Sequence, residues 1–218
     1  MDQSEINNLD IPFLDWAKTL AGENSAFNRV MSSDKNAVYE LDNGNSKLFL
    51  KIGINLELEK SKLEWLKGKL PVPQVMGFTT ITNKEGLLMT AIEGENLASL
   101  ATKWGPEKTI EKLVSALQKF HSTEVTDYSF GEKASNAVLV HGDACLPNFI
   151  YHKEELNGYI DLGDMQVGNV EIDLSAAVWT LQYNFGAGYG LRFLQLYGIT
   201  NSTEDMVEKL RQQYEDKI

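Results

Sequence analysis

Residues 141–161 read HGDACLPNFIYHKEELNGYID. Asp143 and Asn148 lie five residues apart on a predicted loop between two strand-like runs, and Asp161 follows the second run. Loops on a rigid scaffold are where catalytic residues collect. Asn148 and Asp161 offer the hard oxygen ligands that Mg²⁺ prefers, which leaves Asp143 to receive or orient a hydroxyl proton. Any one of these residues alone would instead be interpreted as an Asx turn at a strand end.

The third strand-like run upstream of this segment, Lys47 to Ile52, also carries candidate chemistry. Phe49 and Lys51 share one face of that strand, because side chains alternate along it. An aromatic ring and an ammonium group on one face can stack on a base and hold a phosphate, although a solvated edge lysine is the alternative. Glu59 falls on the apolar stripe of the next helix, where a carboxylate is costly unless it is paired. Lys51 is the expected partner.

The order of elements predicts the fold class. Strands are expected over residues 27–32, 37–41, 47–52, 75–79 and 86–91, and helices over residues 11–21 and 56–70. Downstream we expect a helix from Pro106, short strands at 137–140, 149–151 and 158–160, and helices from about residues 171, 189 and 203. Strands followed by helices predict an α+β protein with two lobes, residues 1–91 and 92–218, joined near residues 90–94.

Charge and composition exclude several classes of protein. The 218 residues carry a net charge of −11, which argues against a nucleic-acid partner because phosphate binding needs a basic face. The acidity favours a cationic ligand only weakly, since acidic chains are often acidic for solubility. The single cysteine, Cys145, excludes an internal disulfide framework. No apolar run approaches the roughly 18 residues of a membrane span, and the acidic N-terminus is unlike a secretory signal, so we expect a cytoplasmic protein.

The loop at residues 141–148 has the His-x-Asp-x-x-x-x-Asn spacing of a protein-kinase catalytic loop. With Gly142 in second place and Gly-Tyr-Ile-Asp-Leu-Gly following, it resembles the aminoglycoside 3'-phosphotransferases, a family of antibiotic and small-molecule kinases. Further segments resemble that family in order: residues 65–73, Leu87-Leu88-Met89, Phe120-His121-Ser122 and residues 196–199. The resemblance therefore extends over most of the chain and implies a two-lobed, protein-kinase-like fold.

The resemblance implies a nucleotide site in the first lobe. Lys51 would hold the α and β phosphates of ATP or GTP with Glu59 as its partner, and Phe49 would stack on the adenine. The backbone from Thr90 to Ile92 would hydrogen-bond the base edge. The phosphate-covering loop would lie near residues 32–36, where either Ser33 or Asp34 takes the key place.

The resemblance also implies roles in the second lobe. Asp143 would be the catalytic base or hydroxyl-orienting group, and Asn148 and Asp161 the Mg²⁺ ligands. Structural support would come from His141, which buttresses the loop, and from Asp173, which anchors its backbone. The acceptor's ammonium groups would meet Asp164 and, near the C-terminus, Glu215, Asp216 and the carboxylate of Ile218.

The sequence departs from the family in two places. Asp164 stands where the family usually has arginine after Ile-Asp-x-Gly, which changes the charge beside the transferred phosphate. Only 19 residues separate His121 from His141, where the family usually has a longer helical insertion that forms one wall of the antibiotic site. We therefore expect a more open acceptor pocket.

These observations and the resemblance predict a kinase, acting as a monomer or weak dimer with Mg²⁺, that transfers the γ-phosphate of ATP or GTP to a small cationic acceptor. The first candidate for that acceptor is an aminoglycoside. One alternative is a kinase of the same fold with another small-molecule acceptor. The other is a nucleotide-binding protein that has lost transfer activity and acts by interaction. Neither nucleic acid nor a membrane is expected as a partner.

Overall fold

The computed structural model describes residues 7–32, 36–130 and 137–217. The chain forms two compact units, one of residues 1–67 and 72–92 and the other of residues 68–71 and 93–218. In the described part of the chain, none of the helices combines the length and the apolar character needed to cross a membrane.

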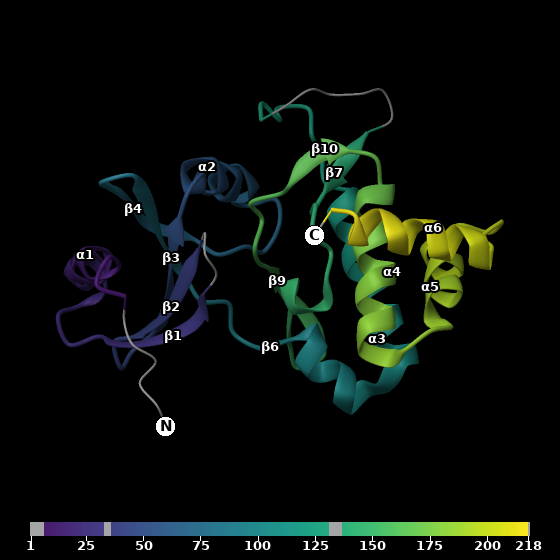
Figure 1. The fold of residues 1–218 in the computed structure, drawn as a ribbon, viewed down its shortest axis with the longest axis horizontal. Coiled ribbons are helices and arrows are strands. Elements are labelled where there is room, and N and C mark those ends of the chain that lie inside the picture. The colour runs from purple at the N-terminus through teal and green to yellow at the C-terminus, as the bar shows by residue number, and fades with distance from the viewer. Residues whose placement is uncertain (1–6, 33–35, 131–136, 218) are drawn as a thin grey trace. The chain divides into compact units, whose positions relative to one another are not determined.

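The first unit is built on one antiparallel sheet with the strand order β1-β2-β3-β5-β4 (Figure 1). The strands are β1 (Ala26–Ser32), β2 (Ala37–Asp42), β3 (Lys47–Gly53), β4 (Val75–Ile81) and β5 (Lys84–Thr90). Helix α1 (Ile11–Ala21) precedes the sheet, and α2 (Leu56–Leu66) connects β3 to β4. The five expected strands are thus present, each within two residues of its predicted ends.

The two helices of this unit cover opposite faces of the sheet. Phe13 and Leu14 of α1 pack in one buried cluster with Leu48, Leu50 and Ile52 of β3. The other face of β3 carries Lys51, which pairs with Glu59 of α2. Buried residues therefore run consecutively along β5, at Leu87 and Leu88, because both faces of that strand are covered.

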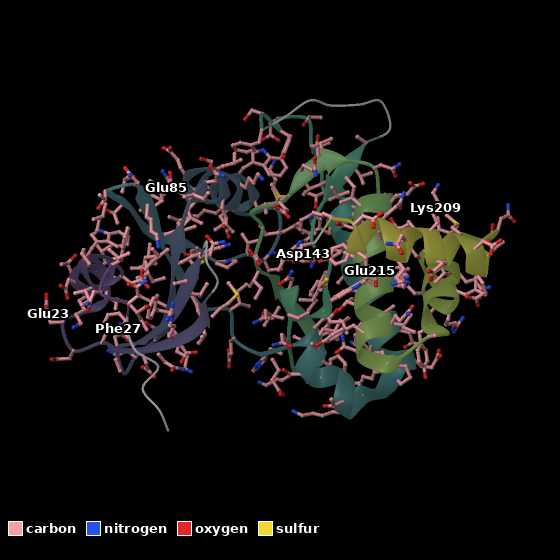
Figure 2. All side chains as sticks on the ribbon, in the orientation of Figure 1. Glu23, Phe27, Glu85, Asp143, Lys209 and Glu215 are labelled. Atoms are coloured by element: carbon pink, nitrogen blue, oxygen red, sulfur yellow. The ribbon has the colours of Figure 1, made fainter. Side chains whose placement is uncertain are left out.

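Helix α2 ends four residues before its predicted end. Lys67 has an extended backbone (ψ 123°), and Gly68 has φ +80°, a left-handed conformation that terminates a helix. The leucine stripe still continues beyond the helix, since Leu70 is buried. At the other end, the carboxylate of Glu85 in β5 (labelled in Figure 2) accepts hydrogen bonds from the backbone N–H groups of Leu56 and Glu57, at 2.5 and 3.2 Å. This contact caps α2 at the end that favours negative charge.

The second unit is mainly helical (Figure 1). Its helices are α3 (Leu97–His121), the 3-10 turn η1 (Leu146–Asn148), α4 (Glu171–Phe185), α5 (Tyr189–Tyr197) and α6 (Glu204–Glu215). Its strands are β6 (Glu95–Asn96), β7 (Val138–Val140), β8 (Phe149–His152), β9 (Glu155–Tyr159) and β10 (Gln166–Gly168). Helix α4 packs against α3, α5 and α6, and six of its first eight residues are buried.

Two local features position the chain for the site. Within α3, Gly105 has φ +72° and ψ 174°, so a second helical segment starts at Pro106, as predicted. Strands β8 and β9 form a hairpin whose two-residue turn, Lys153-Glu154, has positive φ at both residues. That turn places the end of β9, and then Asp161, next to the loop that precedes β8.

Candidate active site

The loop from His141 to Asn148 connects β7 with β8 in the second unit and is held through the His141 ring. His141 is fully buried, and its Nε2 lies 3.0 Å from the carbonyl oxygen of Ile160. The backbone N–H of Asp143 donates to Nδ1 at 3.4 Å. These partners fit a neutral imidazole with its proton on Nε2. His141 therefore joins the loop to the segment before Asp161, which is the buttressing position expected for it.

Asp173, in the first turn of α4, holds the backbone of the same loop. Its carboxylate is completely buried and accepts hydrogen bonds from the N–H groups of His141 (2.7 Å) and Gly142 (2.8 Å). A third contact, 2.9 Å, comes from Nε2 of His121 at the end of α3, whose Nδ1 lies 2.7 Å from the hydroxyl of Tyr197. A buried carboxylate is stable only with such donors. Sequence reasoning expected the backbone contacts but gave His121 no role.

Asp143 is partly buried, and both of its carboxylate oxygens are engaged. Oδ2 accepts a hydrogen bond from Nδ2 of Asn148 at 3.0 Å, and Oδ1 accepts one from the hydroxyl of Tyr214 at 2.5 Å. The Asn148 amide also donates to the backbone oxygen of Asp143 at 2.8 Å. Since Nδ2 serves Asp143, the amide oxygen of Asn148 is the atom left for another ligand.

Asp161 lies beside this loop in the chain that leaves β9. It is exposed and adopts a left-handed backbone conformation, with φ +58°, which is uncommon outside glycine and tends to occur at functional sites. The preceding residue, Ile160, donates its N–H to the carbonyl oxygen of Asn148 at 3.0 Å. The structure thus brings the predicted residues Asp143, Asn148 and Asp161 onto two adjoining segments of one unit.

The donor set here fits a magnesium ion. Among the described residues no three His, Cys, Asp or Glu side chains are grouped to hold a metal ion. Mg²⁺ does not need such a cage, since one or two carboxylates suffice when substrate phosphates and water complete its shell. The amide oxygen of Asn148 and the carboxylate of Asp161 are oxygen donors of that kind.

Helix α6 contributes residues to this site that sequence reasoning missed. Besides Tyr214, Lys217 donates a hydrogen bond to the carbonyl oxygen of Gly142 at 2.7 Å and forms an ion pair with Asp164 at 3.0 Å. Asp143 and Glu215, both labelled in Figure 2, lie toward the C-terminal end of α6. The partners in these contacts are 53 to 75 residues apart in the sequence, and no periodic pattern links them.

The predicted acceptor-binding carboxylates are paired within the chain. Asp164 contacts Lys217, Glu215 forms an ion pair with Arg211, and Asp216 accepts a hydrogen bond from Gln212 at 2.8 Å. Hydrogen bonding to Glu208, Coulombic attraction to Glu208 and Glu215, and a further hydrogen bond to Glu215 raise the pKa of Arg211. The fourth candidate, the carboxylate of Ile218, lies outside the described residues.

In the first unit, Lys51 and Glu59 form the expected ion pair. Their side chains are 13% and 4% exposed, and Nζ lies 2.8 Å from Oε2. Phe49 is half-buried on the same face of β3 as Lys51. The N–H groups of Thr90 and Ala91 are already bonded to carbonyl oxygens of Gln74 (2.9 Å) and Lys47 (3.1 Å).

Within the described residues, the Ile92 N–H is therefore the one amide of the predicted base-binding segment without such a bond. Ser33, and with it the predicted phosphate-covering position, lies outside the described residues.

Comparison with known proteins shows which proteins the chain resembles. The model of the phosphotransferase enzyme family matches residues 131–210, which include the loop at Asp143 and the segment at Asp161. An aminoglycoside 3'-phosphotransferase of Niallia circulans is 28% identical over 197 residues, covering 70% of this chain and 75% of the relative. The chain is thus similar to the aminoglycoside phosphotransferase family. Another relative in that family, from Enterococcus faecalis, is 33% identical over 99 residues, which cover 41% of this chain and 38% of the relative.

Similarity to solved structures shows that the chain has the kinase-like fold predicted from its sequence. Aminoglycoside phosphotransferase APH(3'')-Id from Streptomyces rimosus, in complex with ADP and streptomycin, aligns with a TM-score of 0.76 and 18% identity. The alignment covers 92% of this chain and 96% of that one. APH(4)-Ia in a ternary complex with AMP-PNP and hygromycin B aligns with a TM-score of 0.68 over 89% of this chain and 87% of that one, at 9% identity.

Proposed function

We propose that the protein is an O-phosphotransferase that moves the γ-phosphate of ATP or GTP to a hydroxyl group of an aminoglycoside. The observation that carries the proposal is the geometry at Asp143. Its carboxylate is held at 3.0 Å by Asn148, on a loop whose backbone is anchored by the buried Asp173. The match to the phosphotransferase enzyme family model and the similarity to relatives named aminoglycoside 3'-phosphotransferases support the acceptor class.

In the proposed reaction, a new bond forms between the acceptor oxygen and the γ-phosphorus while the bond from that phosphorus to the β-γ bridging oxygen breaks. The proton of the acceptor hydroxyl passes toward the carboxylate of Asp143, and the nucleoside diphosphate leaves. Asp143 therefore orients the hydroxyl and accepts its hydrogen bond. Catalysis of this kind is mostly positioning and electrostatic stabilisation.

The nucleotide roles follow the residues of the first unit, and the metal roles follow those of the second. We assign the α and β phosphates to Lys51, whose ammonium is held by Glu59 at 2.8 Å, and the stacking surface for the base to Phe49. Base-edge hydrogen bonds are assigned to the backbone of Thr90–Ile92, with the N–H of Ile92 as donor. Asn148 and Asp161 would hold Mg²⁺, which, when bound, neutralises the charge that develops on the transferred phosphoryl group.

One observation favours a second candidate acceptor, a small hydroxyl compound with less positive charge. The ammonium group of Lys217 forms an ion pair with Asp164, and Arg211 forms one with Glu215. Two of the carboxylates proposed to bind a cationic acceptor are therefore already paired with cations of this chain. The short connection between His121 and His141, with only 19 residues, supports the same candidate. In that case the phosphate donor, the metal and the role of Asp143 stay the same.

The proposal is tested by a coupled assay of ADP and GDP release with Mg²⁺ across a panel of aminoglycosides, amino alcohols and sugars. We expect release that depends on an aminoglycoside and a phosphorylated product of matching mass. Asp143→Asn is expected to abolish turnover while nucleotide binding persists; the control is Asp205→Asn, an exposed carboxylate in the first turn of α6.

Three outcomes would count against the proposal. Release with amino alcohols or sugars alone would replace the acceptor class. Binding of Mg-ATP without product from any acceptor would indicate a silent nucleotide-binding protein. Near-wild-type turnover of Asp143→Asn would overturn the mechanism.

A further inference from the structure

Tyr214, in the last turn of α6, reaches the candidate catalytic carboxylate. Its hydroxyl donates to Oδ1 of Asp143 at 2.5 Å, a contact between residues 71 positions apart in the sequence. Hydrogen bonds from a hydroxyl to a carboxylate are the short, strong kind. The contact lies wholly within the second unit.

The Tyr214 hydroxyl is itself held in place. Its ring is buried, with 6% exposed, and lies 5.2 Å from the ring of Trp179 in α4. The thiol of Cys145 lies 3.3 Å from the hydroxyl oxygen, and a longer contact of 3.9 Å joins the thiol to the carbonyl oxygen of Ala176. A thiol that donates to the tyrosine oxygen leaves the tyrosine's own proton for Asp143.

Burial and the hydrogen bond to Asp143 raise the pKa of Tyr214, so the hydroxyl stays protonated and remains a donor.

The carboxylate of Asp143 therefore accepts hydrogen bonds from two different elements of the fold. Asn148, from η1, binds Oδ2 at 3.0 Å, and Tyr214, from α6, binds Oδ1 at 2.5 Å. Two donors on opposite oxygens fix the rotation of the carboxylate about its Cβ–Cγ bond. An ionised carboxylate has about four acceptor positions, so one on each oxygen remains for an incoming hydroxyl group.

We propose that Tyr214 is a positioning residue, which holds the carboxylate of Asp143 in the orientation that meets the acceptor hydroxyl, and that Cys145 orients the Tyr214 proton toward it. The orientation follows from the contacts on α6 and the loop, whereas its effect on turnover rests on the proposed function. Helix α6 is thereby part of the catalytic site and not only of the hydrophobic core.

The orientation is tested first without any assay of activity. Crystal structures of the wild-type protein and of Tyr214→Phe are compared, and the variant is expected to show the Asp143 carboxylate rotated or in two orientations. An unchanged, single orientation overturns the proposal. In the wild-type protein, we also expect a downfield hydroxyl proton resonance that is absent from Tyr214→Phe and from Asp143→Asn. Absence of that resonance from the wild-type protein counts against the hydrogen bond.

The chain's single cysteine gives a second spectroscopic signature. The S–H stretching band in the infrared spectrum belongs to Cys145 alone, because the sequence has no other thiol. If the thiol donates to Tyr214, the band shifts to higher wavenumber in Tyr214→Phe. An unchanged band shows that the thiol donates to Ala176 instead, and the orienting role of Cys145 then fails.

The effect on turnover is tested by steady-state kinetics. A lost hydrogen bond to a charged group predicts a fall in kcat of between about tenfold and a hundredfold for Tyr214→Phe, with the KM values for nucleotide and acceptor within about twofold. Tyr128→Phe is the matched control, because Tyr128 is buried in the same unit and its hydroxyl donates a hydrogen bond to a backbone oxygen, that of Met165 at 3.3 Å.

An unchanged kcat in Tyr214→Phe overturns the positioning role, and a raised kcat shows that Tyr214 blocks Asp143. Failure of the proposed function is a separate result. If the wild-type protein phosphorylates no acceptor, the proposed function is wrong. The orientation of the Asp143 carboxylate in the two crystal structures still decides whether Tyr214 positions it.

Discussion

The ammonium group of Lys217 lies 3.0 Å from the carboxylate of Asp164. Asp164 occupies the position where the resembling family usually has arginine, and the ion pair returns a positive charge to that place from the end of α6. Both side chains are well exposed, at 45% and 62%, so the ion pair is weak and a competing cation can displace it.

Lys217→Gln is therefore expected to lower the KM of a cationic acceptor by up to about fivefold, because exposed ion pairs contribute at most about 1 kcal/mol. The kcat and the nucleotide KM should not change. Lys209→Gln is the control, since Lys209 is exposed on α6 and its replacement removes the same charge (Figure 2). Equal changes in KM for the two variants would show that the net charge of the protein, and not the ion pair with Asp164, affects acceptor binding. An increased KM for Lys217→Gln would show that Lys217 helps the acceptor to bind.

Glu59→Gln is expected to weaken nucleotide binding about tenfold and to lower the free energy of unfolding by about 1–3 kcal/mol. The substitution removes the charge that holds the Lys51 ammonium in a largely buried ion pair. The measurements are titration with Mg-ATP and urea denaturation. Glu64→Gln, at an exposed position of the same helix, should leave both values unchanged. A variant with wild-type nucleotide affinity would exclude Lys51 from the phosphate site or show that it needs no partner.

Gly142→Ala is expected to destabilise the second unit and to reduce activity strongly. A Cβ atom at this position would lie 2.3 Å from the carbonyl oxygen of Asp164, and the φ angle of +87° is also unfavourable for alanine. Gly44→Ala separates the two causes, because Gly44 has φ +83° but no atom within 4 Å of an added Cβ. We expect about 1 kcal/mol of destabilisation for Gly44→Ala and at least about 3 kcal/mol for Gly142→Ala, measured by denaturation. Similar losses would show that backbone conformation, not crowding, requires the glycine.

Burial raises the pKa of the Cys145 thiol from its ordinary value of 9.0 to about 12. The folded protein thus keeps the neutral thiol at a pH where the unfolded chain ionises. Stability from this group is present in full below pH 9 and is lost as the pH rises toward 12. At pH 10 the loss relative to pH 8 is about 1.4 kcal/mol, and Cys145→Ser should lack that part of the pH dependence.

The measurement is urea denaturation at both pH values, together with alkylation of the native protein at pH 8, which should be very slow because the thiolate is the reactive form. Rapid alkylation without unfolding would contradict the burial of Cys145.

The sequence predicts the strands and the loop at residues 141–148 well because their signals are local. The run of residues 47–52 alternates between two faces, and the structure places β3 at Lys47–Gly53 with Leu48, Leu50 and Ile52 buried. The pairing of Lys51 with Glu59 was predictable for the same reason, since a carboxylate on an apolar helix stripe needs a partner. The roles assigned to these residues in binding and catalysis stay predictions.

Contacts made by α6 could not be predicted from the sequence. Tyr214 lies on α6 and Lys217 lies two residues beyond its end. The apolar pattern of the helix indicates only which residues face the core, and nothing in it identifies the loop that these two residues meet. The same is true of the contact between His121 and Asp173, which joins residues 52 positions apart. Asp164 and acidic residues near the C-terminus were interpreted as sites for a cationic ligand, but the structure shows Lys217 beside Asp164 and Arg211 beside Glu215.

The buried carboxylate of Asp173 also sets the timescale on which the site can move. The amide protons of His141 and Gly142 are shielded by an acceptor that belongs to α4, the helix at the centre of its unit. Those protons can exchange with solvent only when the loop separates from that helix. Their exchange is therefore coupled to local unfolding of the helical core and not to the fast fluctuations of an ordinary surface loop. The segment that carries Asp143 therefore has the kinetic character of secondary structure, although it has none of its regular geometry.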